Sequence, residues 1–250
     1  MPATQNHPRT LSRARLYTWF RTPLGRRLSH LEIRFLRNSI KIPYSFTLIQ
    51  LGVLGWERRY LDSGYLRRFR IVAEADSPRT DLPAVIAHLD SLPLQSESVD
   101  MLILPHTLEF CRDQHQLLRE AERVLKPEGQ LLILGFQPWS FYRLYRWLPH
   151  QRHAAPWRCR AIWHHRLLDW LNLLNFSGEL AAWFDFHTIH YSAICHWWRE
   201  CASPLWSVSY ALLAIKRTYT IIPIKPLPHA PPQWTPGLVE PTIQRHDHEK

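Results

Sequence analysis

The sequence predicts an α/β protein with a doubly wound, Rossmann-like, mostly parallel sheet covered by helices on both faces. Short apolar runs alternate with helical segments from Phe46 onward. The run 99–104 is continuously apolar, follows Ser98 and ends at Pro105, which is typical of a parallel strand buried on both faces. Strands that alternate with helices form βαβ units, and their right-handed crossovers favour a doubly wound sheet.

The N-terminal part, residues 1–45, is predicted to be a basic helical extension. A helix is expected over residues 22–41, with Thr22 as its cap and Pro23 at its first position, and a shorter helix precedes it at about 11–20. The longer helix has an apolar stripe, made of Leu24, Leu28, Leu31 and Phe35, and a basic side with Arg27, Arg34 and Lys41. The basic side is interpreted as a solvated face, and docking to nucleic acid or lipid is the alternative.

The main domain is expected to span residues 46–220. Strands are predicted over 46–52, 69–73 and 99–104, followed by a helix that Asp113 caps and that residues 126–129 end. A buried strand over 131–136 comes next. Residues 137–205 form an aromatic and His-rich insertion, predicted to cap a pocket, with a weak strand pattern over 179–186. A last strand is expected over 207–216, and the Pro-rich residues 221–250 are predicted to be an extended or disordered tail.

Composition and charge limit the class of protein. Apolar residues make up 46% and charged residues 21% of the 250 residues, which excludes collagen-like, wholly disordered and polytopic membrane proteins. The net charge of +10, concentrated in residues 1–41, suggests an anionic partner, either RNA or an anionic membrane surface. Four cysteines without a Cys-x2-Cys pair fit reduced thiols in a cytoplasmic protein. The Arg-rich, acid-poor N-terminus also resembles an organelle transit peptide, which is the alternative.

Two glycines, Gly52 and Gly55, follow the first predicted strand. In an open parallel sheet the ligand binds beyond the carboxyl ends of the strands, beside the first strand. Glycine lets the backbone turn tightly and approach a ligand without a Cβ in the way. Two glycines after a strand are also ordinary turn residues, so this signal needs support from the rest of the sequence.

A more specific pattern lies in residues 98–133. The runs SVDMLILPHTLEF (98–110) and LLREAERVLKPEGQLLI (117–133) closely resemble the class I S-adenosylmethionine-dependent methyltransferases, at their fourth strand, the following helix and the fifth strand. Within that group, the LPHxLEF run and the GFQPWS sequence after the fifth strand are similar to a bacterial branch of small-molecule methyltransferases. The resemblance covers residues 46–142 well and residues 170–217 loosely.

The resemblance implies S-adenosylmethionine as cofactor and assigns residues to it. Gly52 and Gly55 correspond to glycines that wrap the methionine and ribose part, and Glu74 or Asp76 to the acid that takes the ribose hydroxyls. In the adenine-side loop, residues 87–94, His88 stands where the family has an acid, and Asp90 is the alternative acid. Leu92 of this loop, Pro105 and Gln50 complete the expected cofactor-binding set. Gln50 replaces the usual first-strand acid and Val53 replaces a glycine, so weakened cofactor binding is expected as one possibility.

The predicted function is transfer of a methyl group to an unidentified acceptor, with a small molecule favoured. His106 follows the fourth strand and is the candidate general base, since an imidazole with an ordinary pKa of about 6.5 removes protons near neutrality; a purely structural His106 is the alternative. A degenerate methyltransferase fold that acts as a binding or regulatory module and an RNA methyltransferase are the rival functions. No metal site is expected, because the His and Cys residues between 150 and 201 match no zinc-finger or ribbon spacing. The sequence does not indicate the oligomeric state.

Overall fold

A computed structural model describes residues 10–41, 43, 45–61, 64–75, 77–140, 159–191 and 206–217. Its centre is one eight-stranded sheet in the order β3-β2-β1-β4-β5-β8-β6-β7. The strands are β1 (Leu48–Leu51), β2 (Phe69–Ala73), β3 (Ala84–Ile86), β4 (Val99–Pro105), β5 (Leu125–Phe136), β6 (Phe176–Phe184), β7 (Ile189–Tyr191) and β8 (Ser209–Lys216). Strands β3, β2, β1, β4 and β5 are parallel, while β8, β6 and β7 continue the sheet in antiparallel pairings. The predicted mostly parallel α/β sheet is confirmed.

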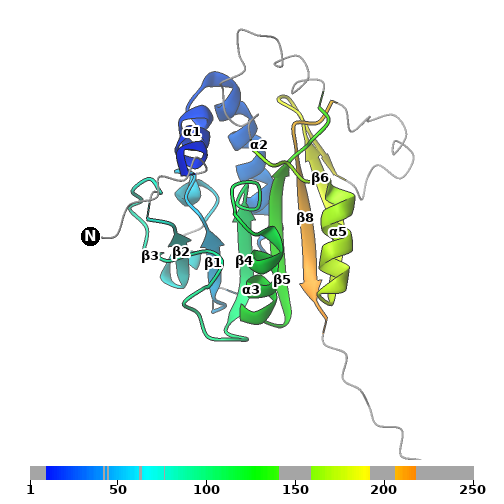
Figure 1. Cartoon of the computed structure of the whole chain (residues 1–250). Helices are drawn as coiled ribbons and strands as arrows, with labels where there is room; N and C mark the ends of the chain where they lie inside the picture. Colours follow the sequence, from blue (N-terminus) through cyan, green and yellow to red (C-terminus); the bar gives the residue numbers. More distant parts are fainter. Residues whose placement is uncertain are drawn as a thin grey trace, which may run out of the picture. The chain divides into compact units, whose positions relative to one another are not determined.

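Helices cover both faces of this sheet. They are α1 (Thr10–Phe20), α2 (Pro23–Ser39), α3 (Gln114–Val124) and α5 (His164–Leu173), with two short 3-10 turns, η1 (Glu57–Arg59) and η2 (Tyr65–Arg67), between β1 and β2. Residues of α1 and α2 share one hydrophobic cluster with Leu48, Ile71 and Met101 of the sheet. Residues of α3 and α5 share a second cluster with side chains from the opposite face of the same strands, and both helices lie in front of the sheet in Figure 1.

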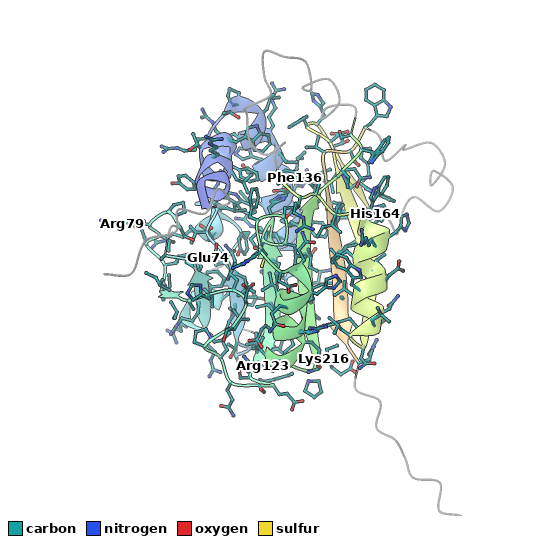
Figure 2. All side chains as sticks on the ribbon, viewed as in Figure 1. Glu74, Arg79, Arg123, Phe136, His164 and Lys216 are labelled. Atoms are coloured by element: carbon teal, nitrogen blue, oxygen red, sulfur yellow. The ribbon has the colours of Figure 1, made fainter. Side chains whose placement is uncertain are left out.

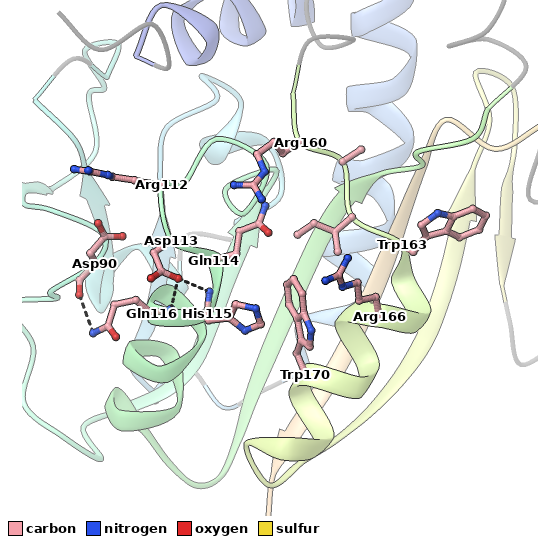
Figure 3. Close-up of a pocket in the computed structure, with 12 residues that line it drawn as sticks. Asp90, Arg112, Asp113, Gln114, His115, Gln116, Arg160, Trp163, Arg166 and Trp170 are labelled. Carbon is pink, nitrogen blue, oxygen red and sulfur yellow. Dashed lines mark hydrogen bonds between the residues drawn. The ribbon is translucent and has the colours of Figure 1, made fainter.

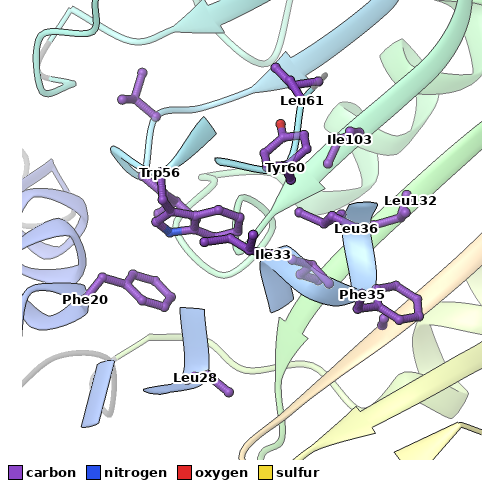
Figure 4. Packing of buried hydrophobic residues seen from close by; sticks show 14 of the residues in the cluster. Phe20, Leu28, Ile33, Phe35, Leu36, Trp56, Tyr60, Leu61, Ile103 and Leu132 are labelled. Carbon is purple, nitrogen blue, oxygen red and sulfur yellow. The ribbon is translucent and has the colours of Figure 1, made fainter. Parts of the chain in front are cut away.

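Helix α2 forms where the sequence predicted it, but its buried face differs from the expected stripe. Thr22 caps the helix, since its Oγ1 accepts a hydrogen bond from the Gly25 N–H at 3.2 Å. Leu28 and Phe35 are buried as expected, whereas Leu24 and Leu31 are only partly buried. The buried face instead includes Ser29, Glu32, Ile33 and Leu36. Figure 4 shows Ile33, Phe35 and Leu36 packed close to Ile103 and Leu132 of the sheet. A carboxylate therefore enters the interior on an otherwise apolar helix face.

Two other expectations need correction. Lys126 to Gly129 was expected to end a helix, but α3 ends at Val124, and Leu125 already begins β5, which is twelve residues long. The early start follows from pairing, because Val99 of β4 pairs with Leu125 before the register shifts. The short strands β3 and β7 were not predicted, since three residues are too few to show a strand pattern.

Several predicted segments fall outside the described residues. These are the Pro-rich tail, residues 221–250, and residues 141–158 and 192–205 of the aromatic and His-rich insertion. Within the described part of the chain, no helix combines the length and the apolar character needed to span a membrane.

Candidate functional site

The glycine turn lies at the carboxyl end of β1, as predicted. Gly52 and Gly55 both adopt left-handed backbone, with φ of 90° and 85°, which side chains other than glycine rarely adopt. The Gly52 N–H donates to the Val72 carbonyl at 2.7 Å, which ties the turn to the end of β2. At Gly55 a Cβ atom would lie 2.4 Å from Cε2 of Tyr17 in α1. Both glycines are therefore needed for backbone shape, and Gly55 also for the close approach of α1.

Behind this turn, Gln50 belongs to a buried hydrogen-bond network. Its amide nitrogen donates to the Gly52 carbonyl at 2.6 Å and to Oε1 of Glu57 at 3.2 Å. Its amide oxygen accepts a hydrogen bond from the Tyr60 hydroxyl. Gln50 is 1% exposed, and its hydrogen bonds are all internal to the chain. It supports the turn from the interior of the protein.

Glu57 supplies the negative charge that Gln50 lacks. Its carboxylate accepts hydrogen bonds from the Leu54 N–H and, at 3.0 Å, from the Gly55 N–H. Charge-assisted bonds to consecutive backbone N–H groups hold a turn firmly. Glu57 was not among the site residues predicted from the sequence. The signal that could have found it is an acid two residues after Gly55, following a strand that has lost its own acid.

Two of the predicted cofactor residues, Glu74 and Asp90, come close to the same side chain, Cys111. Oδ1 of Asp90 accepts a hydrogen bond from the Cys111 thiol at 3.3 Å. Burial, Asp90 and Glu74 together raise the pKa of the Cys111 thiol to about 12. Glu74 follows β2 directly and is half-buried (Figure 2). The structure thus brings the two acids predicted to bind the cofactor near one side chain, Cys111.

The remaining members of the predicted cofactor set have different surroundings. Leu92 is buried, and its N–H donates to Oε2 of Glu120 in α3 at 2.9 Å. Pro105 is the buried last residue of β4. Asp76 lies outside the described residues. Neither Leu92 nor Pro105 adds a free polar group to the site.

His106 sits directly after β4 between two carboxylates. Its Nε2 lies 3.1 Å from Oε1 of Glu32 in α2, and its Nδ1 lies 3.8 Å from Oε1 of Glu109. The ring stacks on Phe136 with centroids 4.0 Å apart. Ser209 Oγ donates to Glu32 Oε1 at 2.8 Å. The backbone at His106 is left-handed, with φ of 50°, which turns the chain sharply at the strand end.

The acids set the protonation state of His106. Burial alone lowers the pKa of the imidazole, but the carboxylates of Glu32 and Glu109 outweigh it and raise that pKa to about 9. His106 therefore carries a proton at neutral pH. As a general base it would first have to give up that proton, which changes the role expected from the sequence. Glu32 was missed as a site residue, although it is the single acid among the basic residues 1–41.

This buried cluster is not fully hydrogen-bonded. Oε2 of Glu32, Oε2 of Glu109 and Nδ1 of His106 are buried atoms without a hydrogen-bond partner, and so are both amide atoms of Gln137, which follows β5. Unpaired buried polar atoms are rare and mark a water, a ligand or a functional constraint. The cluster lies at the carboxyl ends of β4 and β5, the edge where ligands bind in open α/β sheets.

A pocket opens on the other face of the sheet, between the first turns of α3 and α5 (Figure 3). Its volume is about 630 Å³. It is lined by Asp90, Arg112, Asp113, Gln114, His115, Gln116, Arg160, Ala161, Ile162, Trp163, Arg166 and Trp170. Asp90 links the pocket to the predicted cofactor residues, and residues 160–163 belong to the insertion predicted to cap a pocket.

Known proteins share both the sequence pattern and this architecture. A family model described as a methyltransferase domain matches residues 64–133. The chain is similar to the uncharacterized protein YafS of Escherichia coli (strain K12), with 49% identity over 86 residues, 34% of this chain and 36% of YafS. It is also similar to the ubiquinone/menaquinone biosynthesis C-methyltransferase UbiE of Acidiphilium cryptum (strain JF-5), with 32% identity over 96 residues, 34% of this chain and 39% of that protein. The chain thus spans less than half the length of these two relatives.

A solved structure shares the fold over most of this chain. The S-adenosylmethionine-dependent methyltransferase of Thermotoga maritima, described as a possible histamine N-methyltransferase, superposes with a TM-score of 0.57 at 17% identity. The superposition covers 80% of this chain and 93% of that protein. Residues 64–133 of this chain therefore match a methyltransferase domain, and the chain has the fold of an S-adenosylmethionine-dependent methyltransferase.

The segment 64–133 that matches the methyltransferase model includes the predicted residues Glu74, Asp90, Leu92, Pro105 and His106. The glycine turn and the whole of α2, with Glu32, lie outside it. Among the residues that the structure describes, no group of three His, Cys, Asp or Glu side chains is arranged to hold a metal ion. Much of the His and Cys-rich sequence lies in the segments that are not described.

Proposed function

We propose that this protein transfers the methyl group of S-adenosylmethionine to a small-molecule acceptor, in the cytoplasm. The observation that carries the proposal is the glycine turn: two left-handed glycines after β1, at the same edge of the sheet as Glu74 and Asp90. The matching methyltransferase model and the UbiE relative, which by its name is a C-methyltransferase of quinone biosynthesis, support the same reaction class and a small acceptor.

The residues at this edge fit the cofactor. Gly52 and Gly55 leave the backbone free of side chains where the chain turns. Glu74 is the acid for the ribose hydroxyls, and Asp90 is the acid on the adenine side. Glu57 places a carboxylate directly behind the turn, which favours the ammonium group of the methionine end. When bound, S-adenosylmethionine supplies a methyl group on a sulfonium ion, an electrophile that needs little more than a well-placed nucleophile.

In this proposal the Glu32, His106 and Glu109 cluster handles the acceptor's proton. The cluster holds two carboxylate oxygens without a hydrogen-bond partner, Oε2 of Glu32 and Oε2 of Glu109. A carboxylate takes the proton that a neutral acceptor loses on methylation, and His106 is a positioning residue that orients both acids. The cluster has almost no exposed surface, and the Phe20 ring of α1 packs 5.6 Å from the His106 ring.

The proposal is tested by calorimetric titration with S-adenosylmethionine and S-adenosylhomocysteine. Gly52→Arg is the blocking variant, and Asn172→Arg, which adds the same side chain to the exposed side of α5, is its control. Binding by the wild type and the control, lost in Gly52→Arg, supports the proposal. A folded wild type that binds neither ligand overturns it and favours a non-catalytic module.

One observation favours an RNA acceptor as the second candidate. The exposed face of α2 carries Arg26, Arg27, Arg34 and Arg37, and the Arg37 guanidinium donates to the Arg59 carbonyl at 2.6 Å, which adds η1 to the same basic surface. Binding to RNA through this surface weakens steeply as salt rises. A wild-type affinity for single-stranded RNA that is low and independent of salt excludes this candidate.

A further inference from the structure

We propose that the pocket between α3 and α5 binds the anionic head of an organic acid with a flat or apolar body, and that this acid is the methyl acceptor or part of it. The inference rests on the proposed function for the acceptor role, but the binding site itself is argued from the pocket. The ligand class is a carboxylate or phosphate ester attached to a planar or apolar group.

The pocket is lined by more arginines than carboxylates. Arg112, Arg160 and Arg166 line it, and within the described part of the chain none of the three has a carboxylate partner. Of the two acids in the lining, Asp113 is already used as the cap of α3, where Oδ1 accepts the N–H groups of His115 and Gln116 at 3.0 Å. The pocket thus holds an excess of guanidinium groups, whose planar forks match carboxylate and phosphate oxygens.

An apolar wall lies beside these charges. Trp163, Ile162 and Ala161 line the same pocket, and the Trp163 side chain is 38% exposed. The Arg166 guanidinium lies 5.2 Å from the centre of the Trp170 ring. In Figure 3, Arg166 extends between Trp163 and Trp170, and Arg160 lies over the first turn of α3. A ligand that meets the arginines with its charged end therefore has an aromatic surface for its body.

Hydrogen bonds and ring contacts hold the residues that line the pocket in place. The Arg160 N–H donates to the Glu109 carbonyl at 3.3 Å. The Tyr210 hydroxyl donates to the Ile162 carbonyl at 2.9 Å. On the opposite wall, the His115 and Trp170 rings are in contact, with centroids 4.0 Å apart. Residues held in place lose less conformational freedom on binding, which favours affinity.

The position of the pocket joins it to the proposed chemistry. Its lining begins at Asp90, the predicted adenine-side residue, and Arg160 is bonded to the backbone of Glu109, a member of the buried cluster. A body held by Arg160 and Arg166 therefore lies next to both the cofactor residues and the proton-handling residues. Methyl transfer requires this proximity, because the acceptor and donor atoms must meet in line.

The test uses probes that differ only in the head group. The full chain is titrated by calorimetry with 2-naphthoate, 2-naphthyl phosphate and the neutral 2-naphthamide, each with and without S-adenosylhomocysteine. We expect at least one of the two anions to bind at least tenfold more tightly than the amide. The stronger of the two identifies the head group as carboxylate or phosphate.

The variants are Arg160→Gln combined with Arg166→Gln, and Arg34→Gln as control, which removes an exposed arginine from α2 on the opposite face of the sheet. We expect the double variant to lose at least tenfold in affinity for the anion and the control to lose none. Equal affinities for anion and amide, or an unchanged double variant, overturn the inference. Titration with S-adenosylhomocysteine alone separates the two proposals. The pocket variants should leave the affinity for S-adenosylhomocysteine unchanged, and a change in that affinity would count against the cofactor proposal.

Discussion

Replacing Glu32 by Gln removes the acid on which the charge of His106 depends most. Burial lowers the pKa of His106, and among the effects that raise it to about 9 the charge of Glu32 is the largest. The substitution keeps the shape of the side chain and an oxygen that can still accept from Ser209. It therefore changes charge and leaves the packing of α2 nearly intact.

The magnitude follows from linkage. In the unfolded chain the imidazole has a pKa of about 6.5, and in the folded protein about 9, so the folded state binds the proton more tightly. The stabilisation is fully present below pH 6.5 and is lost as the pH rises through 9. A difference of this size amounts to about 3 kcal/mol of unfolding free energy. In Glu32→Gln we expect this loss to fall below about 1 kcal/mol, with a lower stability than wild type at pH 6.

The assay is urea denaturation of wild type, Glu32→Gln and the control Glu179→Gln at intervals from pH 5.5 to 9.5. Glu179 is an exposed acid in β6, so its replacement keeps the wild-type pH dependence. The titration of the His106 ring is followed by NMR in parallel, with its signal assigned from His106→Gln. The reasoning is refuted if Glu32→Gln shows the same fall in stability as wild type, or if the His106 signal titrates near 6.5 in the wild type.

Three further substitutions test the glycine turn. Gly55→Ala places a Cβ 2.4 Å from the Tyr17 ring at a φ of 85°, so we expect about 1–3 kcal/mol lower stability by chemical denaturation and weaker binding of S-adenosylmethionine by calorimetry. Tyr17→Ala in the same chain removes the clash but not the backbone strain, so it should restore stability only in part. Full restoration would show that backbone strain contributes nothing. Glu57→Gln removes the charged carboxylate to which the Gly55 N–H donates, and should lower the free energy of unfolding by about 1–3 kcal/mol and weaken cofactor binding. Unchanged cofactor affinity would argue against a role of Glu57 toward the ammonium group. Tyr60→Phe leaves the Gln50 amide oxygen without its donor and should lower the free energy of unfolding by about 1–3 kcal/mol. Gln50→Leu in the same chain removes the unpaired oxygen and should recover most of this loss. A double variant as unstable as Tyr60→Phe would contradict the hydrogen-bond network.

Local patterns in the sequence predicted the elements that local chemistry controls. The continuous apolar run at 99–104 became the central strand β4, and Asp113 caps α3 through the N–H groups of His115 and Gln116. Thr22 and Pro23 begin α2 as expected. The positions of Gly52 and Gly55 after the first strand also follow from the sequence, because only glycine adopts such backbone without strain.

The candidate site depends on residues that lie far apart in the chain. His106 meets Glu32 from 74 residues away, and Ser209 reaches Glu32 across 177 residues. A periodic pattern places Glu32 on a helix face but gives no information on what that face meets. For the same reason the sequence suggested His106 as a base with an ordinary pKa. In the folded protein the carboxylate of Glu32 from the distant helix α2, together with the neighbouring Glu109, raises that pKa to about 9.

The sequence by itself determined the fold class, the glycine turn and the methyltransferase pattern, since each depends on neighbours within a few residues. Only the tertiary structure decided that Glu57 takes over the charge missing at Gln50, that α2 carries an acid into the core, and that Arg160 and Arg166 face one pocket. The physical reason is that hydrogen bonds and charges act over a few ångströms in space, whatever the separation along the chain. Packing of the helices against the sheet sets those distances.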